Sequence, residues 1–140
     1  MSKLTVLMGA PGSGKSTYAK RYANVVTQDR LRPQAAGDIV HESYKRVNEL
    51  LAAGKDVVFD GTSASAATRK ALVGIARKHG ADAHLCVLDT PLKTCLDVQK
   101  GRARPVADGA VRSLHANVQR QIPQLQNEGF KSITISRDRK

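Results

Sequence analysis

Apolar and polar residues alternate in blocks along the chain, and the blocks predict strands and helices in turn. Short runs rich in apolar and β-branched residues, typical of buried strands, lie at residues 4–8, 24–27, 56–60, 84–88 and 131–136. Between them, apolar residues recur at the three- and four-residue spacing of one helix face. These helical blocks cover residues 15–22, 38–53, 65–79, 92–100 and a last segment that opens at residue 108 and that Pro123 stops.

Strands that alternate with helices in this way predict βαβ units, a parallel sheet and right-handed crossovers. The chain has 140 residues, of which 41% are hydrophobic, about the length and apolar content of one domain. We therefore expect a single α/β domain over residues 1–140, with a central parallel sheet of about five strands flanked by helices.

The apolar runs fall far short of the roughly 18 to 20 residues that cross a bilayer. Residues 1–4 lead directly into a glycine-rich loop, which leaves no room for a signal peptide. A soluble, cytoplasmic protein without a membrane partner is the expectation.

Cysteine and histidine patterns do not predict a metal site made by the protein alone. Cys86 and Cys95 are nine residues apart with no second pair, so we expect reduced thiols in the core. The four histidines lack the spacing of zinc ligands. Any metal is expected to arrive with a substrate.

The charge of the chain points to a polyanionic partner. It carries 23 Lys and Arg against 12 Asp and Glu, a formal net charge of +11, and the excess is densest after residue 90. Such a charge is typical of proteins that bind nucleic acid, although a requirement for solubility alone also explains it. The five aromatic residues, with no Trp, argue against a base-stacking platform.

The loop between the first strand and the first helix carries the most specific motif, GxxxxGK[ST] followed by threonine. Glycines at this spacing let backbone N–H groups turn around phosphate oxygens at a helix N-terminus. The motif predicts that the loop binds a nucleoside triphosphate, with the lysine at the β- and γ-phosphates and the serine on Mg²⁺. Its residues are Gly9, Ala10, Pro11, Gly12, Ser13, Gly14, Lys15, Ser16 and Thr17.

Three acidic or basic side chains follow strands whose carboxyl ends line the expected ligand crevice. After the second strand, Asp29 is a candidate general base and Arg32 a candidate phosphate clamp, and a solvated pair at a helix start is the alternative. Asp60 ends the third strand, where it would hold Mg²⁺ or substrate or, alternatively, cap the next turn.

A basic segment between two helices predicts a lid at about residues 101–107. Arg102 and Arg104 lie between Gly101 and Pro105, so a short loop would carry positive charge over the triphosphate and stabilise the transferring phosphoryl group. An ordinary basic loop is the alternative.

Taken together, these residues resemble the 5'-kinase domain of phage polynucleotide kinases and related small P-loop kinases of the AAA-like P-loop superfamily. The resemblance implies a P-loop kinase fold and ATP with Mg²⁺ as the donor, held by Lys15 and Ser16. The segment from Asp29 to Arg32 is similar to the family's D-x-x-R element, which implies a base for the 5'-hydroxyl and a clamp for the adjoining phosphate.

The resemblance further implies that Asp60 belongs to the acceptor site and that the lid supplies an arginine. The family's lid spacing does not align without a gap, which leaves Arg102 and Arg104 as alternatives. The chain also departs from the fuller phage enzymes because its 140 residues leave no space for a 3'-phosphatase domain.

The expected function is transfer of the γ-phosphoryl group of ATP, or another nucleoside triphosphate, to the 5'-hydroxyl end of DNA or RNA. The first alternative is a kinase for a small molecule or mononucleotide, because the motif constrains the chemistry more than the acceptor. The second is a nucleotide-gated nucleic-acid-binding ATPase, which would bind nucleic acid without phosphorylating it.

Overall fold

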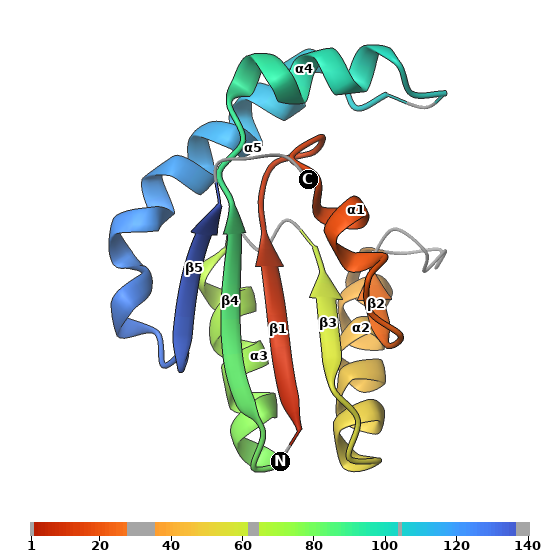
Figure 1. Cartoon of the computed structure of the whole chain (residues 1–140), viewed down its shortest axis with the longest axis vertical. Coiled ribbons are helices and arrows are strands. Elements are labelled where there is room, and N and C mark those ends of the chain that lie inside the picture. Colours follow the sequence, from red (N-terminus) through yellow and green to blue (C-terminus); the bar gives the residue numbers. More distant parts are fainter. Residues whose placement is uncertain (1, 28–35, 62–64, 104, 137–140) are drawn as a thin grey trace.

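A parallel sheet forms the centre of the computed structural model, which describes residues 2–27, 36–61, 65–103 and 105–136. All of its strand pairs are parallel, in the order β2-β3-β1-β4-β5 (Figure 1). The strands are β1 (Lys3–Met8), β2 (Val25–Thr27), β3 (Val57–Asp60), β4 (Asp82–Leu88) and β5 (Ser132–Ser136). The predicted five-stranded parallel sheet flanked by helices is thus confirmed.

Helices cover the sheet unequally. The longer helices lie behind it, a short one lies in front, and another crosses above the carboxyl ends of the strands (Figure 1). In chain order they are α1 (Lys15–Ala19), α2 (Ala36–Ala52), α3 (Ala66–Lys78), α4 (Leu92–Lys100), α5 (Asp108–Gln121) and the 3-10 helix η2 (Ile122–Asn127).

The two faces of β1 show why the sheet has a rear and a front. Leu4, Val6 and Met8 are fully buried in the main core with side chains of α2 and α3. Leu7 faces the other way, into a small front core that includes Ala19 of α1. Towards its amino end the front face of β1 becomes polar and carries Thr5, so the front core reaches only the upper half of the sheet.

Two helix ends differ from the sequence-based expectation. The first helix, expected to run to residue 22, ends at Ala19, because the N–H groups of Arg21 and Tyr22 bond to carbonyls three residues back in tighter turns. Beyond α5 the chain continues as η2. Pro123 stands in the first turn of η2, where a missing N–H costs little.

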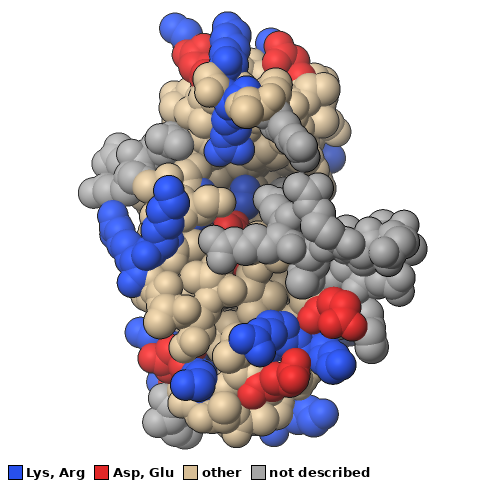
Figure 2. Space-filling model, turned by 90° about the vertical axis from the view of Figure 1, so that its right-hand side faces the viewer, with Lys and Arg blue, Asp and Glu red and all other residues tan. Residues whose placement is uncertain are grey.

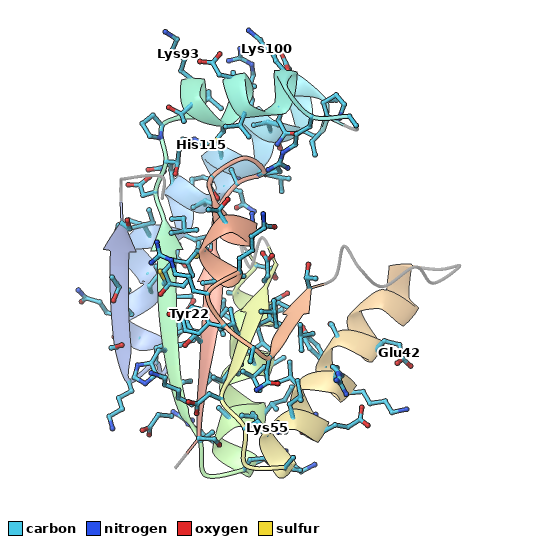
Figure 3. The ribbon with its side chains drawn as sticks, turned by 45° about the vertical axis from the view of Figure 1, so that its right-hand side comes forward. Tyr22, Glu42, Lys55, Lys93, Lys100 and His115 are labelled. Atoms are coloured by element: carbon cyan, nitrogen blue, oxygen red, sulfur yellow. The ribbon has the colours of Figure 1, made fainter. Side chains whose placement is uncertain are left out.

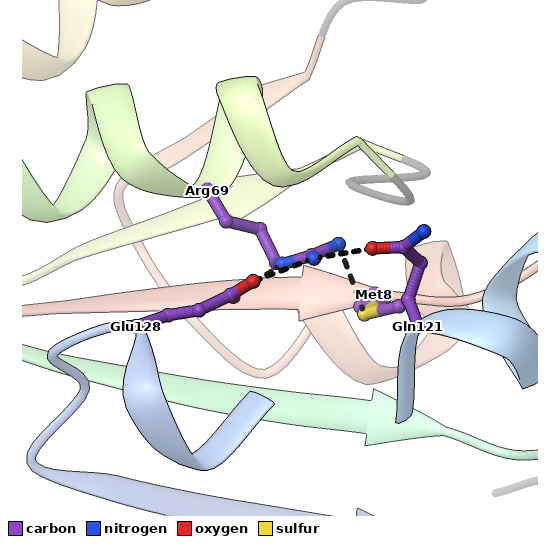
Figure 4. Close-up of polar contacts among 4 residues, drawn as sticks. All are labelled: Met8, Arg69, Gln121 and Glu128. Atoms are coloured by element: carbon purple, nitrogen blue, oxygen red, sulfur yellow. Dashed lines mark hydrogen bonds and ion pairs between the residues drawn. The ribbon is translucent and has the colours of Figure 1, made fainter. Parts of the chain in front are cut away.

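A buried ion pair joins the rear helices to the strand that precedes the glycine-rich loop (Figure 4). Arg69 of α3 is fully buried, and its guanidinium donates to both carboxylate oxygens of Glu128, at 2.6 and 2.8 Å, and to Oε1 of Gln121 at 2.8 Å. Its Nη1 also lies 3.9 Å from Sδ of Met8. The pair therefore fixes α3, α5 and η2 against the end of β1.

Both cysteines are buried, and neither forms a disulfide within the described residues. Burial raises the pKa of Cys86, and a hydrogen bond with Tyr18 offsets only part of that rise, so this thiol stays protonated near neutral pH. The expected position of both thiols in the core is confirmed. In the parts of the chain that the structure describes, no helix has the length and apolarity to span a membrane.

Candidate active site

The glycine-rich loop leaves the carboxyl end of β1 and turns into α1 through two left-handed glycines. Gly12 has φ +86° and Gly14 has φ +103°, a backbone region that other residues enter only with strain. A Cβ atom on Gly12 would also lie 2.7 Å from the carbonyl oxygen of Cys95 in α4. The loop therefore keeps its shape only with glycine at this position.

Replacement of Gly12 by alanine is expected to weaken binding of a nucleoside triphosphate by at least about tenfold, since the loop must shift away from α4 and strain of about 1–2 kcal/mol is added. Titration of a fluorescent ATP analogue measures the effect. Gly74→Ala is the matched control, because a Cβ there meets nothing within 4 Å. Wild-type affinity in Gly12→Ala would contradict the requirement for glycine at this position.

Lys15 carries its charge inside the loop. Its Nζ donates to the carbonyl oxygens of Gly9 at 2.8 Å and Ala10 at 3.1 Å. These bonds hold the ammonium group among backbone atoms of the loop, where a phosphate oxygen would meet it.

Ser16 and Asp60 meet beside this loop although they are 44 residues apart. The Ser16 hydroxyl donates to Oδ2 of Asp60 at 3.1 Å, and the carboxylate is nearly buried, with 7% exposure. A hydroxyl and a carboxylate oxygen side by side suit Mg²⁺, which prefers oxygen ligands. No group of three His, Cys, Asp or Glu side chains that could hold a metal forms within the described residues.

A cavity of about 350 Å³ opens next to this pair. Its lining includes Ser16, Lys20, Thr27 and Asp60, which come from α1, its C-cap and the ends of two neighbouring strands. Figure 2 shows the surface hollowed on this side, below the upper helices. The volume falls in the range of small-ligand pockets, so it has room for part of an acceptor molecule.

Thr90 precedes Pro91 at the start of α4, a position from which its hydroxyl could cap the helix, but it does not. Pro91 is itself the N-cap of α4, and the Thr90 hydroxyl instead donates to the backbone carbonyl of Ser13 at 2.8 Å. His115 Nε2 lies 2.9 Å from the Thr90 carbonyl oxygen. Thr90 thus links the glycine-rich loop to α5. Its hydroxyl bonds to the loop and not to α4 because the buried carbonyl of Ser13 needs a donor more than the exposed start of α4 does.

The segment expected to form the lid contacts Gln99, whose side chain lies beside the glycine-rich loop. This side chain is 1% exposed; its Oε1 accepts the N–H of Val106 at 2.9 Å. A Cβ on Gly12 would lie 3.2 Å from Gln99 Nε2. Arg102 is exposed in the turn after α4, on the same end of the molecule as the glycine-rich loop.

Three of the predicted site residues, Asp29, Arg32 and Arg104, lie outside the described residues. The strand before the first two ends at Thr27, which pairs in register with Asp60. The chain therefore leaves β2 beside the cavity described above.

Sequence reasoning missed Gln99, the link through Thr90 and the Arg69 pair. The spacing of Arg69 with Leu72 and Ala76 places it on the buried face of α3, a signal that a helical projection shows. Gln99 follows Cys95 by four residues, which places it likewise on the buried face of α4, but its place beside the loop depends on how α4 packs.

Comparison with solved structures supports the fold. The chain is similar to a chain of the Pnkp1/Rnl/Hen1 complex, with 24% identity and a TM-score of 0.60 over 76% of this chain, and it spans 41% of the length of that chain. It is similar to Chaetomium thermophilum Kti12 in complex with ADP-AlF3, with 16% identity, a TM-score of 0.70 and coverage of 96% and 88% of the two chains.

A third similar structure is the Mycobacterium tuberculosis APS kinase CysC in complex with AMPPNP and APS. Here the identity is 21% and the TM-score 0.57, and 90% of this chain and 98% of that chain are covered. At these identities the likeness concerns the fold, which is that of P-loop kinases. Comparison with curated proteins finds no match.

The family comparison covers most of the sequence. A model described as an AAA domain matches residues 4–125, a span that contains the glycine-rich loop, Asp60 and the lid segment. The chain therefore belongs to this AAA domain family, with the P-loop kinase-like fold that its sheet and loop display.

Proposed function

We propose that the chain is a kinase that transfers the γ-phosphoryl group of ATP, or another nucleoside triphosphate, to the 5'-hydroxyl of DNA or RNA. The observation that carries the proposal is the Ser16–Asp60 contact beside a glycine-rich loop with Lys15 at its centre. This arrangement supports a donor site for a triphosphate with an open cavity next to it.

On the donor side, backbone N–H groups of the loop and the Lys15 ammonium would bind the β- and γ-phosphates. Ser16 and Asp60 would hold Mg²⁺, which neutralises charge on those phosphates when bound. Arg102 or Arg104 would approach from the lid and stabilise the charge on the transferring group.

On the acceptor side, Asp29 would accept the proton of the attacking 5'-hydroxyl while Arg32 binds the neighbouring phosphate of the acceptor. The hydroxyl oxygen forms a bond to the γ-phosphorus, and the bond from that phosphorus to the leaving diphosphate oxygen breaks. Both steps depend mainly on positioning and electrostatics.

The charge of the chain favours a polymeric acceptor. A net charge of +11 over 140 residues is more than a small acceptor requires, whereas a nucleic acid presents many phosphates to it. The likeness to an APS kinase with APS bound favours a small-molecule or mononucleotide acceptor as the second candidate. A nucleotide-gated nucleic-acid-binding ATPase is a third candidate.

Replacement of Asp29 by alanine is expected to lower the rate of transfer about 10²- to 10⁴-fold, the usual contribution of a general base. Affinity for ATP should stay within about twofold, because the base contacts only the acceptor. The measurement is single-turnover transfer of labelled γ-phosphate to an oligonucleotide with a 5'-hydroxyl, together with an ATP-binding titration.

Asp97→Ala is the control for a lost carboxylate, since Asp97 is exposed on α4. The same oligonucleotide with a 5'-phosphate should take up no label from the wild-type chain. If Asp29→Ala lowered the ATP affinity and the transfer rate by the same factor, Asp29 would not be the general base. Label on the 5'-phosphorylated strand would remove the 5'-hydroxyl as the acceptor.

A further inference from the structure

A hollow made of neighbouring cavities surrounds the C-terminal end of α1, and nothing in the donor chemistry explains it. Three cavities, of about 350, 400 and 380 Å³, follow one another there. The first contains Ser16 and Asp60, the second lies below α1 against β1 and β3, and the third extends over the uncovered front of β4 and β5. Neighbouring cavities share lining residues, so together they extend from the candidate transfer site to the front face of the sheet.

Tyr22 stands where the three cavities meet, since it lines all of them. It is one of two large apolar side chains in the described structure that are exposed, at 40%, and Figure 3 shows it between α1 and the strands. Its hydroxyl donates to that of Tyr18 at 3.3 Å, and the two ring centroids are 5.6 Å apart. The ring is therefore held in place and still offers surface to a ligand.

The Tyr18 hydroxyl remains neutral in this pair. The hydrogen bond with Tyr22 and burial both raise the pKa of Tyr18, so neither deprotonation nor negative charge arises there at physiological pH. The guanidinium of Arg21 lies over the Tyr18 ring, 5.7 Å from its centroid, at a distance where a cation and an aromatic face attract.

The lining combines this aromatic pair with cations and hydroxyls. Lys3, Arg21 and Lys20 supply positive charge, and the floor over β4 and β5 includes His84, Ser132 and Thr134. Two carboxylates also line the hollow. Asp60 belongs to the candidate transfer site, and Asp56 accepts the backbone N–H of Lys3 at 2.9 Å. Along the path away from the transfer site the lining is thus cationic and rich in hydroxyl groups.

Single-stranded nucleic acid is the ligand that suits these features. Proteins that bind it without reading sequence use a basic groove along the backbone and aromatic rings on which bases stack. We propose that the hollow around α1 holds the nucleotides of a single-stranded acceptor that follow its 5' end, with a base stacked on Tyr22 and phosphates near Arg21 and Lys3. This inference rests on the proposed function, and it specifies where the acceptor strand lies on the protein.

Binding of oligonucleotides without ATP tests the path separately from the chemistry. The probes are oligothymidylates of about two to about ten nucleotides, each with a 5'-hydroxyl and a fluorophore at the 3' end, and the readout is fluorescence anisotropy. For the wild-type chain the affinity should rise with length until the hollow is filled, and a blunt duplex should bind more weakly than a single strand.

Tyr22→Ala is expected to weaken binding of the longer strands about tenfold, the loss typical of one stacked base, while Tyr22→Phe keeps wild-type affinity. Arg21→Gln should reduce the slope of log affinity against log salt by about one phosphate contact. Lys93→Gln is the matched control, because Lys93 is exposed on α4 and points away from the hollow (Figure 3). Thermal unfolding curves confirm that the variants fold.

The outcomes separate this inference from the proposed function. If Tyr22→Ala and Arg21→Gln bind all strands like the wild type, the path is overturned, even if phosphoryl transfer to 5' ends is observed. Equal binding of duplex and single strand, unaffected by Tyr22→Ala, also overturns it. Tyr22-dependent binding of single strands without any transfer supports the path and counts against the kinase.

Discussion

Replacement of Lys15 by alanine is expected to reduce phosphoryl transfer by at least about 10²- to 10³-fold, the loss seen when one preorganised donor to developing charge is removed. The ammonium lies within the loop, at 2.8 and 3.1 Å from two of its carbonyl oxygens, so alanine removes both the charge for the phosphates and an internal contact of the loop. The measurement is kcat for label transfer at saturating ATP.

Lys15→Arg separates the two effects. It keeps the positive charge, but the planar guanidinium does not reproduce the compact ammonium between the carbonyls of Gly9 and Ala10, so this variant should also lose most of its activity. Lys93→Ala, which removes an exposed cation on α4, is the control and should stay active. Transfer by Lys15→Ala at more than about a tenth of the wild-type rate would show that the loop is not the donor site.

Replacement of Glu128 by alanine is expected to lower the free energy of unfolding by about 3 kcal/mol, because it leaves the buried Arg69 guanidinium without its carboxylate. Arg69 is fully buried and Glu128 nearly so, at 0% and 16% side-chain exposure. Urea unfolding followed by circular dichroism measures the change.

Two comparisons sharpen this prediction. Asp97→Ala breaks the exposed pair with Lys100, whose atoms are 3.8 Å apart, and should cost about 0–1 kcal/mol. The double variant Arg69→Met with Glu128→Leu should recover most of the stability lost in Glu128→Ala, since apolar side chains avoid the cost of a buried charge. If Glu128→Ala unfolds at the wild-type urea concentration, the ion pair does not stabilise the rear of the sheet.

The succession of strands along the chain could be predicted from the sequence because each strand is short, apolar and bounded by turn residues, and the alternation with helices predicted a parallel sheet. Helix α4 has the predicted bounds, Leu92–Lys100, since the proline before it and the glycine after it define both ends. The end of α1 could not be predicted, because residues 20–22 continue the helical spacing while their backbone bonds tighten. Helix η2 was missed because Pro123 signals a stop in the sequence, whereas here it begins a new turn.

The sequence located the glycine-rich loop and the acidic strand end, and the structure brings Ser16 and Asp60 of these two segments together. Strand order explains this contact: β1 and β3 are neighbours, and Leu7 pairs with Asp60 in register. The hollow at Tyr22 could not be predicted from the sequence. The small number of aromatic residues argued against base stacking. Two of the five, however, lie four residues apart at the end of α1. Their position beside the uncovered front of the sheet depends on the fold.

The central claim is tested most directly by one transfer assay with many acceptors. The chain is incubated with γ-labelled ATP and Mg²⁺ and a panel of 5'-hydroxyl DNA and RNA oligonucleotides, nucleosides, nucleoside monophosphates and sugars, with Lys15→Ala as the blank. We expect label at oligonucleotide 5' ends and none in the blank. Label only on the small acceptors, or ATP-dependent binding of oligonucleotides with no labelled product, would contradict the account.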